Sequence, residues 1–189
     1  MNKAILFKAF ILLLVASCKT EASENENKNQ PVALSINSNA FNHGDSMPYI
    51  YTCLNPSQVF PHLSWSGGSS AIKSYCLILD DPDAIPVVGY VWNHWVIYDI
   101  PDSIHSILKG ISNKANLPLG AIPGTNSFSD TTYGGPCPPT GQLHHYYFRL
   151  YGLTTASLMI GRSATVAQVR QAMAGKISDS AVLMGTFRR

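Results

Sequence analysis

The stretch SYCLILDDPDA, residues 74–84, passes from a continuous apolar run directly into a cluster of carboxylates. The run at residues 75–79 has the length and composition of a buried strand. Asp80, Asp81 and Asp83 then stand at the end of that strand, beside the predicted core, where an unpaired charge is costly. Because Asp and Pro also favour turns, a solvated turn is the alternative interpretation of these carboxylates.

Similar short segments recur on both sides of this strand, separated by Pro, Gly, Asn and Asp. Short strands divided by turn residues are typical of an antiparallel β-sandwich. The sequence therefore predicts a mainly β fold, a Greek-key-like sandwich with a few short helices. The predicted strands lie at residues 33–36, 63–65, 75–79, 93–98, 146–151 and 181–187.

One segment has helical spacing instead of strand spacing. Thr165 can cap it, Val166, Val169 and Met173 follow on one face, and Gly175 is placed to end it. We expect this apolar face to pack against the sheet, and we assign it no part in the function.

The composition describes a packed globular domain and argues against nucleic acid as a partner. Of the 189 residues, 46% are hydrophobic and only 13% are charged, which argues against a disordered chain. The formal net charge is +2, and the sequence contains no basic cluster or stripe of interleaved basic and aromatic residues. Such a patch is the usual mark of a nucleic-acid-binding surface.

The first residues predict export. Lys3 and Lys8 flank a wholly apolar run at residues 9–16, which fits the hydrophobic region of a signal peptide and is too short to span a bilayer. The run ends in Val15-Ala16-Ser17-Cys18, which resembles a bacterial lipobox and so implies lipidation at Cys18. An ordinary signal peptide with an incidental cysteine, or a buried N-terminal helix, is the alternative.

These features divide the chain into three parts. Residues 1–17 are predicted to be a lipoprotein signal peptide, and residues 18–30 are a polar stretch that suits a flexible tether. Residues 31–189 form the single predicted domain. We therefore expect an exported lipoprotein, anchored through Cys18 on the periplasmic or cell-surface side of a membrane.

Four cysteines have to be assigned in this oxidising compartment. Cys18 is the predicted lipidation site, and Cys76 lies inside the apolar run, so we expect it to be a buried thiol. Cys53 and Cys137 remain as the candidate disulfide. They could instead be two buried thiols, because sequence alone does not show that they are close enough to bond.

A second cluster of polar and aromatic side chains follows at residues 92–98. Alternation along a strand predicts that Trp92, His94, Val96 and Tyr98 share one face. Taken alone, His94 fits a core histidine with a satisfied hydrogen bond better than it fits a functional residue.

A third cluster closes a long loop at residues 112–139 that is rich in Gly, Pro, Asn and Ser. Loops of this length in a compact domain are usually functional. Its last part, Gly134-Gly135-Pro136-Cys137-Pro138-Pro139, can bring backbone N–H groups close to a ligand. His144 and Tyr146 then share one face of the next strand, although a structural turn leading into a strand would explain the same residues.

Taken together and in this order, the three clusters resemble the phosphatidylethanolamine-binding protein family, also called Raf-kinase-inhibitor-like proteins, and its bacterial branch in particular. The resemblance covers nearly the whole domain, and it implies the family's β-sandwich with short helices. It also implies an anion pocket, whose residues by position are Asp81, Asp83, His94, Pro139, His144 and Tyr146.

This pocket suggests how the anion is held. Imidazole N–H and phenol O–H groups can donate to anionic oxygens, and the backbone of Gly134 and Gly135 can add further donors. Asp81 can fix the tautomer of a histidine and favour its charged form. Trp92 and Pro138, together with the Tyr146 ring, complete the predicted ligand-binding set as apolar walls or loop positions.

We therefore expect non-catalytic binding of a phosphate-like anion or phosphorylated headgroup, with modulation of an unidentified protein partner as a further role. We expect no cofactor and no metal, because the resemblance implies none. Three alternatives remain open. A metal site of two histidines and one carboxylate could form, a hydrolase could use His94, His144 or Asp81 as acid or base, and a protease-inhibitor-like module could bind a protein.

Overall fold

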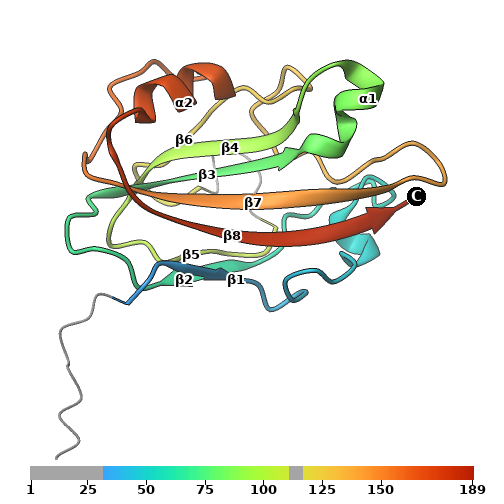
Figure 1. The fold of residues 1–189 in the computed structure, drawn as a ribbon, viewed down its shortest axis with the longest axis horizontal. Helices are drawn as coiled ribbons and strands as arrows, with labels where there is room; N and C mark the ends of the chain where they lie inside the picture. The colour runs from blue at the N-terminus through green and yellow to red at the C-terminus, as the bar shows by residue number, and fades with distance from the viewer. Residues whose placement is uncertain (1–31, 111–116) are drawn as a thin grey trace, which may run out of the picture. The chain divides into compact units, whose positions relative to one another are not determined.

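Two antiparallel sheets lie face to face in the computed structural model, which describes residues 32–110 and 117–189 (Figure 1). The smaller sheet has the strand order β1-β2-β5, and the larger has the order β6-β4-β3-β7-β8. The predicted mainly β sandwich with a few short helices is thereby confirmed. The strands are β1 (Ser35–Asn37), β2 (Leu63–Ser66), β3 (Ser74–Asp81), β4 (Trp92–Pro101), β5 (Ser106–Ile107), β6 (Ile122–Pro123), β7 (Leu143–Leu153) and β8 (Ile177–Arg188).

Four short helical segments connect or cover these strands. Three of them, η1, η2 and α1, are single turns, and η2 and α1 fill the connection between β3 and β4. The fourth, α2, lies over the face of the large sheet that is opposite the small sheet (Figure 1). The bounds are η1 (Tyr49–Tyr51), η2 (Pro82–Ala84), α1 (Ile85–Val88) and α2 (Val166–Met173).

The hydrophobic core is divided by the large sheet. Between the two sheets, Leu63 and Ile107 of the small sheet pack with Leu79, Trp95 and Phe148 of the large one. Burial of such side chains contributes roughly 1.5–3 kcal/mol each, so this layer fixes the sandwich.

A second core layer lies between the large sheet and α2. Cys76 and Ile78 of β3 pack there with Val169 and Met173 of α2. Cys76 is the buried free thiol that the sequence predicts. Thr165 caps α2 through the capping box that it forms with Gln168, so the predicted helix is confirmed.

A β-bulge at His94 interrupts the pairing of β3 with β4. Leu79 pairs with Trp95 and the next residue, Asp80, pairs with Asn93, so His94 is an extra residue on β4. A bulge of this kind re-aims side chains and is common beside functional sites.

Because of this bulge, one prediction about the side chains of β4 is wrong. Val96 and Tyr98 pack in the core layer under α2, whereas His94 contacts Tyr146 in the layer between the sheets. The prediction that Trp92, His94, Val96 and Tyr98 share one face is therefore wrong for Val96 and Tyr98. The extra residue reverses the simple alternation on which that prediction rested.

The six predicted strands are all present, although several are longer than predicted. Strand β3 continues through Asp81, and β7 begins at Leu143, so both strands carry polar site residues at their ends. The two-residue strands β5 and β6 are too short to give a periodic signal. The described part of the predicted loop at 112–139 is irregular apart from β6.

The predicted signal peptide (1–17) and tether (18–30), including Cys18, lie outside the described residues. Within residues 32–110 and 117–189, no helix is long and apolar enough to cross a membrane.

Candidate functional site

A hollow of about 290 Å³ opens at one end of the large sheet. Because β4 and β7 run antiparallel to β3, the end of β3 meets the beginnings of β4 and β7 there. The three sequence clusters thus meet at one place in the fold. The hollow is lined by Asp81, Ala84, Val87, Val88, Trp92, His94, Phe128, Cys137, Pro138, Pro139, His144 and Arg189.

A buried carboxylate stands between two buried imidazoles. The Nδ1 atom of His144 lies 2.8 Å from Oδ2 of Asp81, and Nε2 of His94 lies 4.0 Å from the same oxygen. All three side chains are at most 5% exposed. The geometry therefore brings Asp81, His94 and His144 into one cluster, with Asp81 holding His144 directly.

The hydrogen bonds fix which ring nitrogens carry protons. His94 donates from Nδ1 to the carbonyl oxygen of Gly134 at 2.8 Å, and His144 donates from Nδ1 to Asp81. In each neutral ring, Nε2 would then be an unprotonated acceptor. Each Nε2 becomes a donor only when its ring is an imidazolium, and the His144 imidazolium can donate to Oε1 of Gln142 at 3.3 Å.

Three buried polar atoms in this cluster make no hydrogen bond within the described residues: Oδ1 of Asp81, Nε2 of His94 and the hydroxyl of Tyr146. Tyr146 contacts both imidazole rings, with centroids 5.2 Å from His94 and 6.4 Å from His144. Leaving a buried polar group unpaired costs about 1–3 kcal/mol. Unpaired atoms gathered beside a hollow are what a site for a polar ligand requires.

The electrostatics of the cluster favour a charged Asp81 and a neutral Tyr146. Burial by itself would raise the pKa of the Asp81 carboxyl, but the two imidazoles beside it, His94 at 4.0 Å and the hydrogen-bonded His144, hold that pKa below its ordinary value. Burial, assisted by the Asp81 charge, raises the pKa of the Tyr146 hydroxyl far above its ordinary value. Tyr146 is therefore a protonated hydrogen-bond donor at any physiological pH.

An aromatic wall closes one side of the hollow. Trp92 stacks on Tyr90 with ring centroids 5.8 Å apart and meets Phe128 edge-on at 5.1 Å. The ring of Phe128 also lies 5.7 Å from that of His94. Phe128 is held there by the side chain of Asn126, whose oxygen accepts from its backbone N–H at 2.9 Å. Together these rings shield the imidazole cluster from water.

The glycine loop supports the cluster from behind instead of lining the hollow. Gly134 supplies the carbonyl that holds His94, and an added Cβ there would lie 2.3 Å from a ring carbon of Phe128. The N–H of Gly135 donates to the side chain of Gln58. Neither glycine lines the hollow, so the structure does not place their N–H groups toward a ligand.

A disulfide between Cys53 and Cys137 ties this loop to the segment after η1, with a Cα–Cα distance of 5.4 Å. The backbone N–H of Cys53 also donates to the carbonyl of Pro136. Because Pro138 and Pro139 follow directly and line the hollow, this anchor positions one of its walls.

Asp83 is placed apart from the other predicted site residues. One of its oxygens accepts from both the backbone N–H and the ring Nδ1 of His145, at 2.7 Å and 2.6 Å. His145 lies next to His144, and its side chain is 38% exposed. Asp83 thus fixes the turn after β3 against β7, and it does not line the hollow.

Arg189 is a lining residue that the sequence analysis missed. It follows β8, which pairs with the beginning of β7, so the sheet register brings it beside His144. Its carbonyl accepts from the N–H of Gly141 at 2.7 Å, and the contact of its Nη1 with Cys137 is a weak one at 3.7 Å. The apolar lining residues Val87, Val88 and Phe128 were missed as well, because they lie in the single turn α1 and in the long loop, where no periodic pattern indicates which side chains face the hollow.

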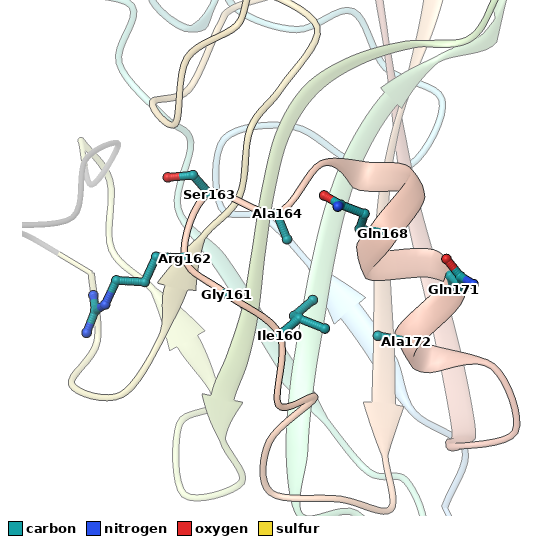
Figure 2. A pocket seen from close by; sticks show the side chains of 8 residues that line it. All are labelled: Ile160, Gly161, Arg162, Ser163, Ala164, Gln168, Gln171 and Ala172. Atoms are coloured by element: carbon teal, nitrogen blue, oxygen red, sulfur yellow. The ribbon is translucent and has the colours of Figure 1, made fainter.

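A larger hollow of about 610 Å³ lies between α2 and the loop before it, but it lacks a comparable cluster. Figure 2 shows Arg162 extending away from α2, so the one charged lining residue does not converge with Gln168 and Gln171. As for the metal alternative, the described residues contain no group of three or more His, Cys, Asp or Glu side chains placed to hold a metal ion.

Comparison with known proteins identifies the family. The family profile described as "Phosphatidylethanolamine-binding protein" matches residues 37–188, which is most of the chain. This chain belongs to the phosphatidylethanolamine-binding protein family. The resemblance inferred from the three sequence clusters is thereby confirmed.

Relatives place the chain in the bacterial and archaeal branch of that family. A UPF0098 protein of Methanothermobacter thermautotrophicus is 38% identical over 156 residues, covering 82% of this chain and 99% of that protein. Among solved structures, a phosphatidylethanolamine-binding protein homologue from Chlamydia trachomatis is 32% identical with a TM-score of 0.74, covering 83% of this chain and 98% of that one. YbcL of Escherichia coli has 26% identity and a TM-score of 0.77, with 84% and 99% covered.

A further relative is named as a lipoprotein. A Mycobacterium tuberculosis protein named "Putative lipoprotein LppC" is 37% identical over 155 residues, covering 82% of this chain and 72% of that protein.

Proposed function

We propose that this protein binds a phosphate-like oxyanion, carried on a larger molecule, in the hollow formed by Asp81, His94 and His144, without catalysing its conversion. The observation that carries the proposal is that two residues lining this hollow, Asp81 and His94, each have a buried polar atom without a hydrogen-bond partner; Tyr146 is packed against His94 and does not itself line the hollow. Nε2 of His94 and the Tyr146 hydroxyl can act as donors, and Oδ1 of Asp81 is an acceptor. Family membership, which implies an anion-binding pocket, supports the same function.

Charged imidazoles favour anion binding at this site. Nδ1 of both histidines is committed to an acceptor, so an incoming oxyanion meets Nε2. A neutral ring presents a lone pair there and repels the anion, whereas an imidazolium presents an N–H and a positive charge. With both rings charged, the cluster of two imidazoliums and one carboxylate has a net charge of +1, which suits a single anionic group.

The hydrogen-bonding groups of the cluster also limit the kinds of ligand that fit it. An oxyanion satisfies the donors, and Oδ1 of Asp81 can accept a hydrogen bond from a donor on the ligand or from a bridging water. A protonated phosphate ester or a phosphate with a nearby ammonium group offers both. The aromatic wall of Trp92 and Phe128 adds apolar contact for the part of the molecule next to the phosphate.

The lining of the hollow supports binding more than covalent catalysis. Among its lining residues there is no serine or threonine, and Cys137 is part of a disulfide. Many hydrolases that form a covalent intermediate use one of these side chains as the nucleophile.

Calorimetric titration with sulfate tests the proposal, because sulfate keeps the same charge from about pH 5.5 to pH 8 while a phosphate monoester does not. We expect tighter binding at the lower pH, since an imidazolium offers an anion a charged donor at Nε2 and a neutral imidazole does not. His94→Ala and His144→Ala should each weaken binding about ten- to hundredfold by removing one charge-assisted hydrogen bond. Arg189→Ala should weaken it less, because its guanidinium is exposed.

His105→Ala is the matched control, because His105 is exposed and packs edge-on against Tyr75, away from the hollow. It should leave both the affinity and its pH dependence unchanged. An affinity that is the same at both pH values and indifferent to His94 and His144 would show that the hollow is not an anion site.

We further propose that the domain is held at a membrane by a lipid on Cys18. The lipobox-like sequence before Cys18 and the lipoprotein name of the mycobacterial relative support this proposal.

A further inference from the structure

A second cluster of charged side chains lies on the opposite face of the same sheet. Asp80 and Asp81 are neighbours on β3, so their side chains point to opposite faces. Asp81 faces the cluster described above, whereas Asp80 lies under α2, where it meets Arg149 of β7 and Arg170 of α2.

Two guanidinium groups share the single carboxylate of Asp80, which is 4% exposed. Nε of Arg149 donates to both of its oxygens, at 3.0 Å and 2.9 Å, and Nη2 of Arg170 donates to Oδ2 at 2.8 Å. Asp80 is therefore fully paired, and the cluster keeps one positive charge in excess.

Both guanidinium groups are held in place while part of each remains open. Arg149 lies over the ring of Tyr147 at 4.6 Å, and its two Nη groups make no hydrogen bond within the described residues. Arg170 makes one further contact, from Nη1 to the hydroxyl of Tyr151 at 3.3 Å. Their side chains are 29% and 42% exposed, so the free donors are accessible to a ligand.

These donors border a hollow of about 420 Å³ between α2 and strands β3, β4 and β7. Asn93 and Tyr151 add an amide and a hydroxyl to its lining, and Asp80 is the one acidic residue among the residues that line it. Guanidinium groups with fixed geometry suit oxyanions, because each can donate two parallel hydrogen bonds. Since the arginines are already ordered by Asp80, a ligand would pay little of the usual ordering cost.

We propose that Arg149 and Arg170 form a second oxyanion site, which takes the phosphate or sulfate group of a small molecule independently of the histidine cluster. Arginine stays charged throughout the physiological range, so binding here should not depend on pH. This property separates the second site from the first, where protonated imidazoles favour binding.

The test uses ¹⁵N-labelled His94→Ala/His144→Ala protein, titrated with sodium sulfate at constant ionic strength and followed by NMR. We expect saturable shifts of the backbone amides of Asn93, Arg149 and Ala167, with the same Kd at pH 6 and pH 8. Methyl sulfate and glycerol phosphate, titrated separately, show which ester the site takes. Arg170→Gln should weaken binding at least tenfold, and Arg162→Gln, which changes an exposed arginine outside this hollow, should not alter it.

A second variant guards against simple damage to the fold. Asp80→Asn removes the internal competitor for the two guanidinium groups and should tighten sulfate binding several-fold, which a merely destabilised protein would not do. Shifts that do not saturate, or a Kd unchanged by Arg170→Gln and by Asp80→Asn, would overturn the proposal.

Discussion

Replacing Cys53 and Cys137 by alanine opens a covalent ring whose two ends are 84 residues apart in the sequence. In the chain-entropy description, closing a loop of this length lowers the entropy of the unfolded chain and stabilises the fold by about 4.6 kcal/mol at 25 °C. That is a large part of the 5–15 kcal/mol or so that a domain of this size usually has. If the free energy of unfolding falls by about 2 kcal/mol for each molar of urea, the urea concentration at the unfolding midpoint should fall by about 2 M.

The effect on the folded loop should be much smaller than the effect on stability. Several hydrogen bonds still hold the loop, among them Cys53 N–H to Pro136, Gly135 N–H to Gln58, and the Tyr133 hydroxyl to Tyr51. We therefore expect sulfate affinity in the folded variant to change less than threefold or so, since no charge-assisted bond is lost.

Urea unfolding of the wild type, with and without a reducing agent, provides the assay. Reduction should lower the wild-type midpoint to near that of the double variant and leave the variant unchanged. If the free energy of unfolding decreases by less than about 1 kcal/mol, the reasoning is refuted, because closing the loop would then not stabilise the fold as described.

Two further predictions concern Asp81 and Cys18. The folded-state pKa of Asp81 is held below its ordinary value, so its charge stabilises the protein above about pH 4, and this contribution disappears as pH falls through the folded pKa. The difference in unfolding free energy between wild type and Asp81→Asn should thus be largest near neutral pH and shrink below about pH 4; a constant difference in urea midpoints from pH 7 to pH 3 would contradict it. For Cys18→Ser in the full chain, the domain should move from the membrane fraction to the soluble fraction with an unchanged thermal unfolding midpoint; unchanged partitioning would argue against the lipid anchor.

The general architecture could be predicted from sequence because it rests on local signals. The apolar run at 75–79, the Thr165 cap and the turn residues between strands each act over a few residues, and the structure has β3, α2 and the remaining predicted strands where those signals stand. Short elements such as β5 and β6 escaped prediction because two residues carry no period.

The arrangement of the site was less predictable, because it depends on register and not on local pattern. The bulge at His94 adds one residue to β4, and no residue type in the sequence marks it. Arg189 reaches the hollow through the pairing of β8 with β7. Asp83 binds His145 and does not face His94 or His144. The sequence motifs predicted which residue types form the cluster. Long-range strand pairing determines which of those residues face each other.

A crystal grown at about pH 5.5 and soaked separately with phosphate and with phosphoethanolamine tests the central claim most directly. The account predicts a phosphate group in the hollow, with one oxygen within hydrogen-bonding distance of Nε2 of His94 and a ligand donor facing Oδ1 of Asp81. A metal ion held by the two Nε2 atoms, or a hollow that stays without phosphate while other surfaces bind it, would contradict the account.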